Sequence, residues 1–144
     1  GSDRGNSIIM SDNIVHVMEG GDLDIGFRSW SNSDRHVING NVLIVDEGGK
    51  CGMAMSLRGE GAVVTGNNIF SALDTPLPLN IGGGNTLVTG NIFENVTVVV
   101  DDVTEQGKPI LVNNNIMDHS TIEYHRGELK ADVAFTKAGE PSGL

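Results

Sequence analysis

Three carboxylates, Asp24, Asp101 and Glu123, stand at similar places in segments that repeat along the chain. Hydrolysis of a glycosidic bond requires two carboxyl groups, one as the acid and one as the base or nucleophile, roughly 5 to 9 Å apart. Asp101 and Glu123 fall in successive segments, so we interpret them as the candidate catalytic pair, with His125 beside them as a proton shuttle. The alternative is structural, because a chain with 19 acidic residues brings some carboxylates together by chance.

Two arginines, Arg28 and Arg58, are candidates for binding an anion. On neighbouring strands of a stack their side chains would start about 5 Å apart. A carboxylate or sulfate group fits between two such guanidinium groups, so an acidic sugar is the ligand that we expect. The alternative is that both arginines are solvated or paired with Asp24 and Asp101.

The candidates for metal binding are few. Four carboxylates in or beside two successive turns could supply oxygen ligands for Ca²⁺, although their spacing matches no known calcium loop: Asp22, Asp24, Asp46 and Glu47. The histidines His16, His36 and His119 are scattered, and Cys51 is the only cysteine. The sequence therefore predicts no zinc site and no intrachain disulfide.

A repeat that runs through most of the chain positions these residues. Each copy has an apolar pair, one or two small polar residues, an Asn and a second apolar pair, and the five copies centre on Asn13, Asn41, Asn68, Asn91 and Asn115. These positions are separated by 28, 27, 23 and 24 residues. Self-similarity at this period predicts stacked coils.

Within each copy, Gly or Asn marks a tight corner between two short strands, because these residues tolerate positive φ best. In a stack the Asn side chains lie above one another and bond along it, so we interpret them as a structural ladder rather than as catalytic residues. Alternating apolar residues predict a third strand in each copy, at residues 23–28, 53–58, 77–82, 96–101 and 121–126.

Alignment of the third strands predicts three columns of outward residues. The first column contains Asp24, Ala54, Pro78, Thr97 and Thr121. The second contains Gly26, Ser56, Asn80, Val99 and Glu123. The third contains Arg28, Arg58, Gly82, Asp101 and His125.

Composition limits the class of protein. The 144 residues suit one domain, in which 20 glycines and few aromatics favour short strands over helices. The net charge of −10 argues against a nucleic-acid or anionic-membrane surface, since both bind clustered Lys and Arg. No run of 18 apolar residues and no signal peptide is visible, so we expect no membrane span.

Residues 1–126 form the predicted solenoid, and 127–144 form a cap strand and tail.

Three strands per coil, a period in the twenties and an Asn at the sharp corner resemble the right-handed parallel β-helix of the pectate-lyase-like superfamily. That superfamily includes polysaccharide lyases, polygalacturonases and phage tailspike depolymerases, and the resemblance covers about residues 8–126. It implies an all-β, single-stranded parallel β-helix of about five coils, extracellular or virion-associated, and trimeric if it is tailspike-like. It also implies that a polysaccharide lies along the third strands and contacts these residues: Asp24, Arg28, Arg58, Asn80 and His125.

The superfamily's catalytic motifs are absent from this chain. It has neither the Gly-His-Gly and Arg-X-Lys elements of polygalacturonases nor the Trp-X-Asp-His stretch of pectate lyases. We therefore expect a module that binds an acidic polysaccharide. One alternative is a polysaccharide lyase or glycoside hydrolase that uses Asp101 and Glu123. Another is a scaffold that stabilises an oligomer through exposed apolar residues such as Phe70 and Val99.

Overall fold

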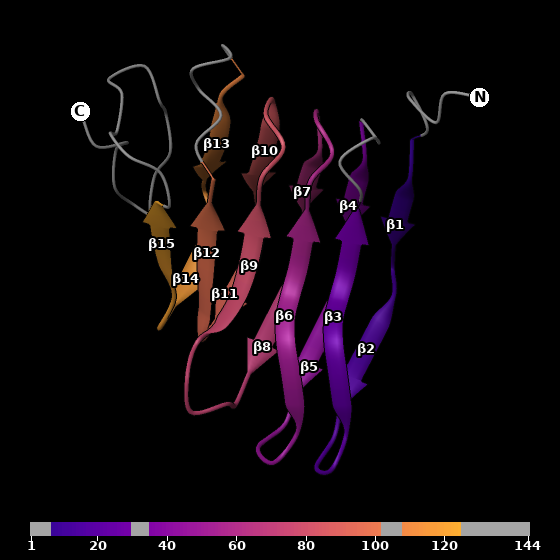
Figure 1. Ribbon diagram of the computed structural model, residues 1–144, viewed down its shortest axis with the longest axis vertical. Coiled ribbons are helices and arrows are strands. Elements are labelled where there is room, and N and C mark those ends of the chain that lie inside the picture. Colours follow the sequence, from indigo (N-terminus) through magenta and orange to yellow (C-terminus); the bar gives the residue numbers. More distant parts are fainter. Residues whose placement is uncertain (1–6, 30–34, 102–107, 125–144) are drawn as a thin grey trace.

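The computed structural model describes residues 7–29, 35–101 and 108–124, which form fifteen β-strands and no helix. The strands belong to three sheets of five strands, and all the pairings are parallel. The chain visits the three sheets in turn and then returns to the first, one strand further along (Figure 1). The predicted all-β solenoid with three strands per coil is confirmed.

Three successive strands make one rung, and the described residues contain five rungs. Sheet A contains β1 (Ile9–Ser11), β4 (Val37–Asn39), β7 (Val63–Thr65), β10 (Thr86–Thr89) and β13 (Ile110–Asn113). Sheet B contains β2 (Ile14–Val17), β5 (Val42–Val45), β8 (Asn68–Ser71), β11 (Ile92–Glu94) and β14 (Ile116–Asp118). Sheet C contains β3 (Asp22–Ser29), β6 (Lys50–Leu57), β9 (Leu77–Ile81), β12 (Val96–Val100) and β15 (Thr121–Tyr124).

Aliphatic side chains from all three sheets fill the interior. Strand alternation turns every second residue inward, as Ile38 of sheet A, Leu43 of sheet B and Leu79 of sheet C show, each fully buried. Burying a side chain of this size stabilises the fold by about 1.5 to 3 kcal/mol. The predicted shared interior is therefore confirmed, and stacking of rungs rather than any cross-link holds the fold together.

Each rung turns from sheet A to sheet B at a single residue with positive φ. These residues are Asp12 (58°), Gly40 (70°), Gly66 (67°), Gly90 (71°) and Asn114 (53°). Gly, Asn and Asp are the types that adopt this left-handed conformation at least cost. The residue that follows each of them is an Asn whose side chain turns into the corner.

These five asparagines form a continuous ladder: Asn13, Asn41, Asn67, Asn91 and Asn115. The Nδ2 atom of each donates to the Oδ1 atom of the next over 2.9 to 3.0 Å. The backbone N–H of the same residue donates to the same oxygen over 3.0 to 3.1 Å. From the second rung on, Nδ2 also donates to a carbonyl oxygen of the preceding rung. The amide groups of a buried corner are satisfied in this way.

The prediction for the third rung was wrong by one residue, because the ladder residue there is Asn67 and not Asn68. Asn67 follows Gly66 and is 1 % exposed, whereas Asn68 begins β8 and is exposed on the outward side of sheet B. The ladder spacings are therefore 28, 26, 24 and 24 residues. The residue with positive φ decides which of two adjacent asparagines enters the corner.

The predicted third strands are confirmed to within a few residues at each end, except that residues 125 and 126 of the last one lie outside the described residues. The predicted cap strand and tail at residues 127–144 lie outside the described residues. Among the residues that are described, none belongs to a helix that could cross a membrane.

Replacement of the ladder residue should cost far more stability than replacement of its neighbour. Asn67→Ala removes the acceptor of two hydrogen bonds from Asn41 and leaves buried amide groups unpaired, so we expect a loss of about 3 kcal/mol in the free energy of unfolding. Asn68→Ala is the matched control, with a change within about 0.5 kcal/mol. Chemical denaturation measures both, and equal losses would contradict the assignment of Asn67 to the ladder.

Candidate functional site

The outward face of sheet C carries three of the five residues that the sequence suggested for binding: Asp24, Arg28 and Asn80. A depression of about 350 Å³ lies on this face, above β9 and its neighbours. It is lined by Met53, Pro76, Pro78, Asn80, Thr97, Val99 and Glu123. The depression therefore spans four of the five strands of sheet C, from β6 to β15.

Asn80 is the central polar residue of this depression. It lies on β9, opposite Ser56 of β6 and Val99 of β12, and its side chain is half-buried. Its Oδ1 atom is buried and accepts no hydrogen bond from any described residue. An unmet buried acceptor costs about 1 to 3 kcal/mol, so a rotation of the amide that brings Oδ1 to a donor in the depression would be favourable.

The register brings Arg28, Asn80 and Glu123 into one outward column. Arg28 pairs with Ser56, Ser56 with Asn80, Asn80 with Val99, and Val99 with Glu123. Arg28 and Glu123 are exposed. The prediction that Val99 is exposed was wrong, because its side chain is only 9 % exposed. The prediction that Phe70 is exposed is confirmed, since its side chain is 41 % exposed.

The prediction that Arg28 and Arg58 are direct neighbours was wrong. Every pairing between the first two rungs joins residues 28 apart, whereas alignment of the two arginines needs an offset of 30. Turn pairing fixes this register, because the Gly20 N–H donates to the Gly48 carbonyl over 3.1 Å. Arg28 therefore lies opposite Ser56, and Arg58 follows the end of β6.

The offset of 28 residues, rather than the predicted 30, also changes the neighbour of Asp24 on the next strand. Its neighbours Leu23 and Ile25 pair with Cys51 and Met53, so Asp24 lies opposite Gly52 and not Ala54. A Cβ atom at Gly52 would approach the Asp24 carbonyl oxygen to 2.9 Å, which shows how closely the two backbones lie. Because the shift is of two residues, Asp24 still faces outward, and it is exposed.

Arg58 forms an ion pair with Asp101 across the intervening rung. The Nη1 atom of Arg58 lies 3.3 Å from Oδ2 of Asp101, and the side chains are 51 % and 39 % exposed. Gly82 lies between them, and a Cβ atom there would stand 3.0 Å from Nη1 and 3.3 Å from Oδ2. The missing side chain of Gly82 makes room for the pair, which was the alternative that the sequence left open for Arg58.

The proposed catalytic carboxylates lie on neighbouring rungs but not side by side. Glu123 is opposite Val99, and Asp101 is two residues further along the same strand direction. This places the Cα atoms roughly 8 Å apart. The ion pair with Arg58 draws the carboxylate of Asp101 away from Glu123. A catalytic role for these two residues stays a prediction, and His125 lies outside the described residues.

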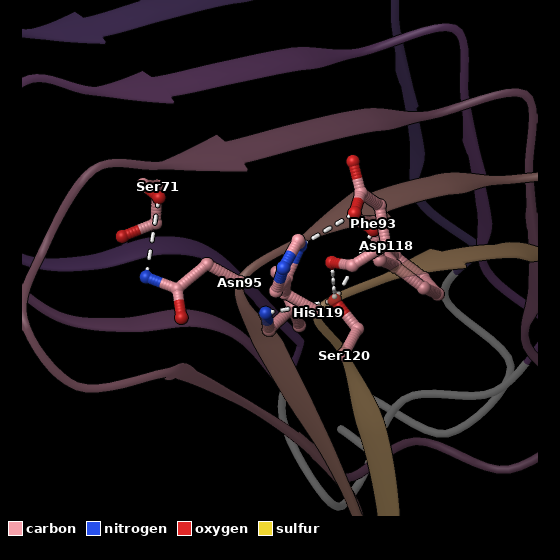
Figure 2. A network of polar contacts seen from close by, with 7 residues as sticks. Ser71, Phe93, Asn95, Asp118, His119 and Ser120 are labelled. Atoms are coloured by element: carbon pink, nitrogen blue, oxygen red, sulfur yellow. Dashed lines mark hydrogen bonds and ion pairs between the residues drawn. The ribbon is translucent and has the colours of Figure 1, made fainter.

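A second polar cluster, which the sequence did not suggest, lies at the corner between sheets B and C (Figure 2). Glu94 lies opposite Asp118, and His119 Nδ1 is 2.6 Å from Asp118 Oδ1. Asn95, with φ of 58°, donates to the carbonyl oxygens of Ser71 and Leu73 over 3.2 and 2.8 Å. The sequence could have indicated that these two carboxylates are neighbours, because Glu94 and Asp118 each follow a ladder Asn by three residues.

The neighbouring Asp118 affects the protonation of Glu94. Partial desolvation, the Asp118 charge and a hydrogen bond with Asp118 raise the pKa of Glu94. Two carboxylates that share a site favour one bound proton. The cluster lines a depression of about 390 Å³ together with Ser71, Ala72 and Leu73.

Metal ligands do not converge in the part of the chain that the structure describes, where no group of three His, Cys, Asp or Glu side chains could hold an ion. Of the four carboxylates suggested for calcium, Asp22 and Asp24 lie on β3, while Asp46 forms a hydrogen bond of 2.8 Å with His16. A calcium site stays a prediction. Burial, with a smaller contribution from Asp24, raises the pKa of the Cys51 thiol, which opposes reactivity at neutral pH.

Glu94→Gln should stabilise the protein at neutral pH. Because the pKa of Glu94 is raised by folding, the folded state favours its protonated form, and stability falls as the pH rises through the raised value. The amide removes the repulsion from Asp118, so the melting temperature should rise at pH 7 and stay close to that of the wild type at pH 4. Thermal unfolding across this range tests it; a variant less stable than the wild type at pH 7 contradicts it.

Comparison of the chain with family models, with curated proteins and with solved structures finds no match. Its class is therefore given by its architecture: the chain is a parallel β-solenoid with an asparagine ladder.

Proposed function

We propose that this chain is a carbohydrate-associated β-helix module that binds an acidic polysaccharide on the outward face of sheet C. The observation that supports the proposal is the unmet Oδ1 acceptor of Asn80 in the depression above β9. Sugar hydroxyl groups are hydrogen-bond donors and would supply the missing bond once the amide turns Oδ1 towards the depression.

The lining of the depression suits a sugar ring. Met53, Pro78 and Val99 supply apolar surface, while Thr97 and Glu123 supply polar groups at its edge. Binding sites for small molecules are typically apolar with a few polar groups that fix orientation. A sugar ring has apolar C–H faces and a polar rim of hydroxyl groups, so it can use both kinds of contact.

The acidic character of the proposed ligand depends on the two arginines. Arg28 and Arg58 have exposed side chains at the same end of sheet C, and the net charge of −10 leaves few other places for an anionic group. An exposed ion pair such as that of Arg58 with Asp101 contributes at most about 1 kcal/mol. A uronic acid carboxylate could therefore replace Asp101 at the guanidinium group.

Binding is a better proposal than catalysis for this face, because the carboxylate of Asp101 already pairs with Arg58 on the side away from Glu123. The proposal extends to membership of the pectate-lyase-like superfamily and to a place outside the cell or on a virion, as part of a tailspike or a polysaccharide-processing protein. That extension rests on analogy of fold.

Removal of the Asn80 amide should weaken polysaccharide binding. We expect Asn80→Leu to lower the affinity for polygalacturonate about tenfold, since it removes hydrogen bonds worth about 1 to 1.5 kcal/mol. Titration calorimetry measures the affinity. A glycan array that includes neutral polymers, read together with an assay for reducing ends and unsaturated products, separates binding from turnover.

Asn39→Leu is the matched control, because Asn39 is an exposed asparagine on β4 of sheet A, away from the depression. It should leave the affinity unchanged. Asn80→Leu should also keep or raise the melting temperature, since it removes an unmet buried acceptor. Absence of binding to every glycan, or equal affinity of wild type and Asn80→Leu, would overturn the proposal.

A further inference from the structure

Strand β6 of sheet C is longer than the strand that follows it in the stack. It has eight residues, whereas β9 has five. On one side it pairs with β3 from Lys50 to Leu57, but its pairing with β9 begins only at Met55. In Figure 1 the start of β6 reaches beyond β9, and the connector from β8 to β9 forms a wide loop. The first half of β6 is therefore an open strand edge in the middle of the stack.

Two prolines keep the third rung from pairing with this edge. In a parallel ladder the N–H and the carbonyl of one residue face the same neighbouring strand, and successive residues face opposite neighbours. Leu77 donates its N–H to the Asn95 carbonyl over 2.9 Å, towards β12. The residues on either side of Leu77 therefore face β6, and both of them, Pro76 and Pro78, lack an N–H. Pairing with β6 begins only after Pro78.

The open edge presents main-chain groups of two residues. Lys50 donates its N–H to the Gly21 carbonyl over 2.8 Å, towards β3. Cys51 and Met53 therefore face the open side. The Met53 carbonyl accepts a bond from Cys51 Sγ over 3.4 Å. Neither the Met53 N–H nor the main-chain groups of Cys51 form a hydrogen bond on that side with a residue that the structure describes. These three groups are available to an added strand.

A cleft of about 480 Å³ lies along the open edge. It is lined by the first residues of β3 and β6 and by residues 73–75 of the connector between β8 and β9. Its inner side is apolar, because Leu23, Cys51 and Leu73 are partly buried and pack against the core. The cleft therefore replaces part of the wall that a longer third-rung strand would have formed.

The outer side of the cleft is acidic. Asp22, Asp24 and Asp74 line it with exposed side chains. None of these three carboxylates forms an ion pair with a described residue. Among the described residues that line the cleft, Lys50 alone is basic. A cationic group that enters the cleft would therefore meet carboxylates without competing for an existing pair.

We infer that this cleft binds an extended segment of another protein, which adds as a short strand to the edge of β6. Peptides bind open sheet edges through main-chain hydrogen bonds, and contacts of alternate side chains give the specificity. Alternation along the added strand turns every second side chain towards the apolar inner side and the others towards the carboxylates. The segment that fits therefore alternates apolar and basic residues. The net charge of −10 favours its approach.

The short length of the open edge limits the partner. Only three main-chain groups are open, so the bound segment is short and the complex is reversible. The same limit keeps the edge from seeding an extended sheet, which is the usual hazard of an exposed strand. The inference goes beyond the proposed polysaccharide site and does not depend on it, because no sugar takes part.

Binding of synthetic peptides to the full chain tests the inference. The probe is a fluorescently labelled short peptide in which Val and Lys alternate, and the control has Glu in place of Lys. Fluorescence polarisation should show saturable binding of the first peptide and none of the second. Because the N–H groups of a strand point alternately to its two sides, methylation of one set of amides, either those of Val or those of Lys, should abolish binding. Methylation of the other set should leave the affinity unchanged.

Substitution of the cleft carboxylates gives a second readout. Asp24→Asn combined with Asp74→Asn should lower the affinity for the Val–Lys peptide about fivefold. Asp12→Asn combined with Glu60→Gln is the matched control, because it removes the same charge at a distance. Asp12 precedes β2 and Glu60 follows β6, so a strand length separates each from the cleft. The control should change the affinity less than about twofold, since salt screens charges at this distance.

Three results would overturn the inference. Absence of saturable binding of the Val–Lys peptide would exclude the site. Equal affinity of the two methylated peptides would exclude pairing with a strand edge. Equal loss of affinity in the two double variants, both folded by circular dichroism, would show that the peptide responds only to the total charge of the protein.

Discussion

The buried asparagine ladder is the constraint on which the rest of this structure depends. A polar corner inside a narrow solenoid must satisfy its amide groups without water, and each ladder Asn does so with a donor and an acceptor to the adjacent rungs. The residue with positive φ before it fixes the turn, and the turn fixes which residues of sheets A and B face inward. The outward faces, on one of which we propose a binding site, are therefore set by the corner.

Much of the fold could be predicted from the sequence, because the apolar pairs and the Asn between them are local signals. The third rung was misassigned since two asparagines are adjacent, and only the backbone of Gly66 distinguishes them. The candidate site was predicted less well. Similar residue types suggested aligning Arg28 with Arg58, but turn pairing through Gly20 and Gly48 sets another offset. The pair of Arg58 with Asp101 depends on the space left by Gly82, which no periodicity reveals.

The three sheets divide the surface of the solenoid by chemistry. Sheet C has long strands and carries arginines, carboxylates and the unmet Asn80 acceptor. Sheet B has short strands, and its exposed positions are mostly aliphatic or aromatic. Equivalent residues of successive rungs form columns on each face. A change in the length of one turn therefore shifts all the residues of the following strand relative to these columns.

The ladder also has an electrical direction. From Asn13 to Asn91 each ladder amide donates to the Oδ1 atom of the later rung, so the four bonds along the row all run the same way, from Asn13 to Asn115. Aligned dipoles reinforce one another in a medium of low polarity. The row therefore carries partial negative charge at the Asn13 end and partial positive charge at the Asn115 end. Two such rows attract when they lie antiparallel and repel when they lie parallel.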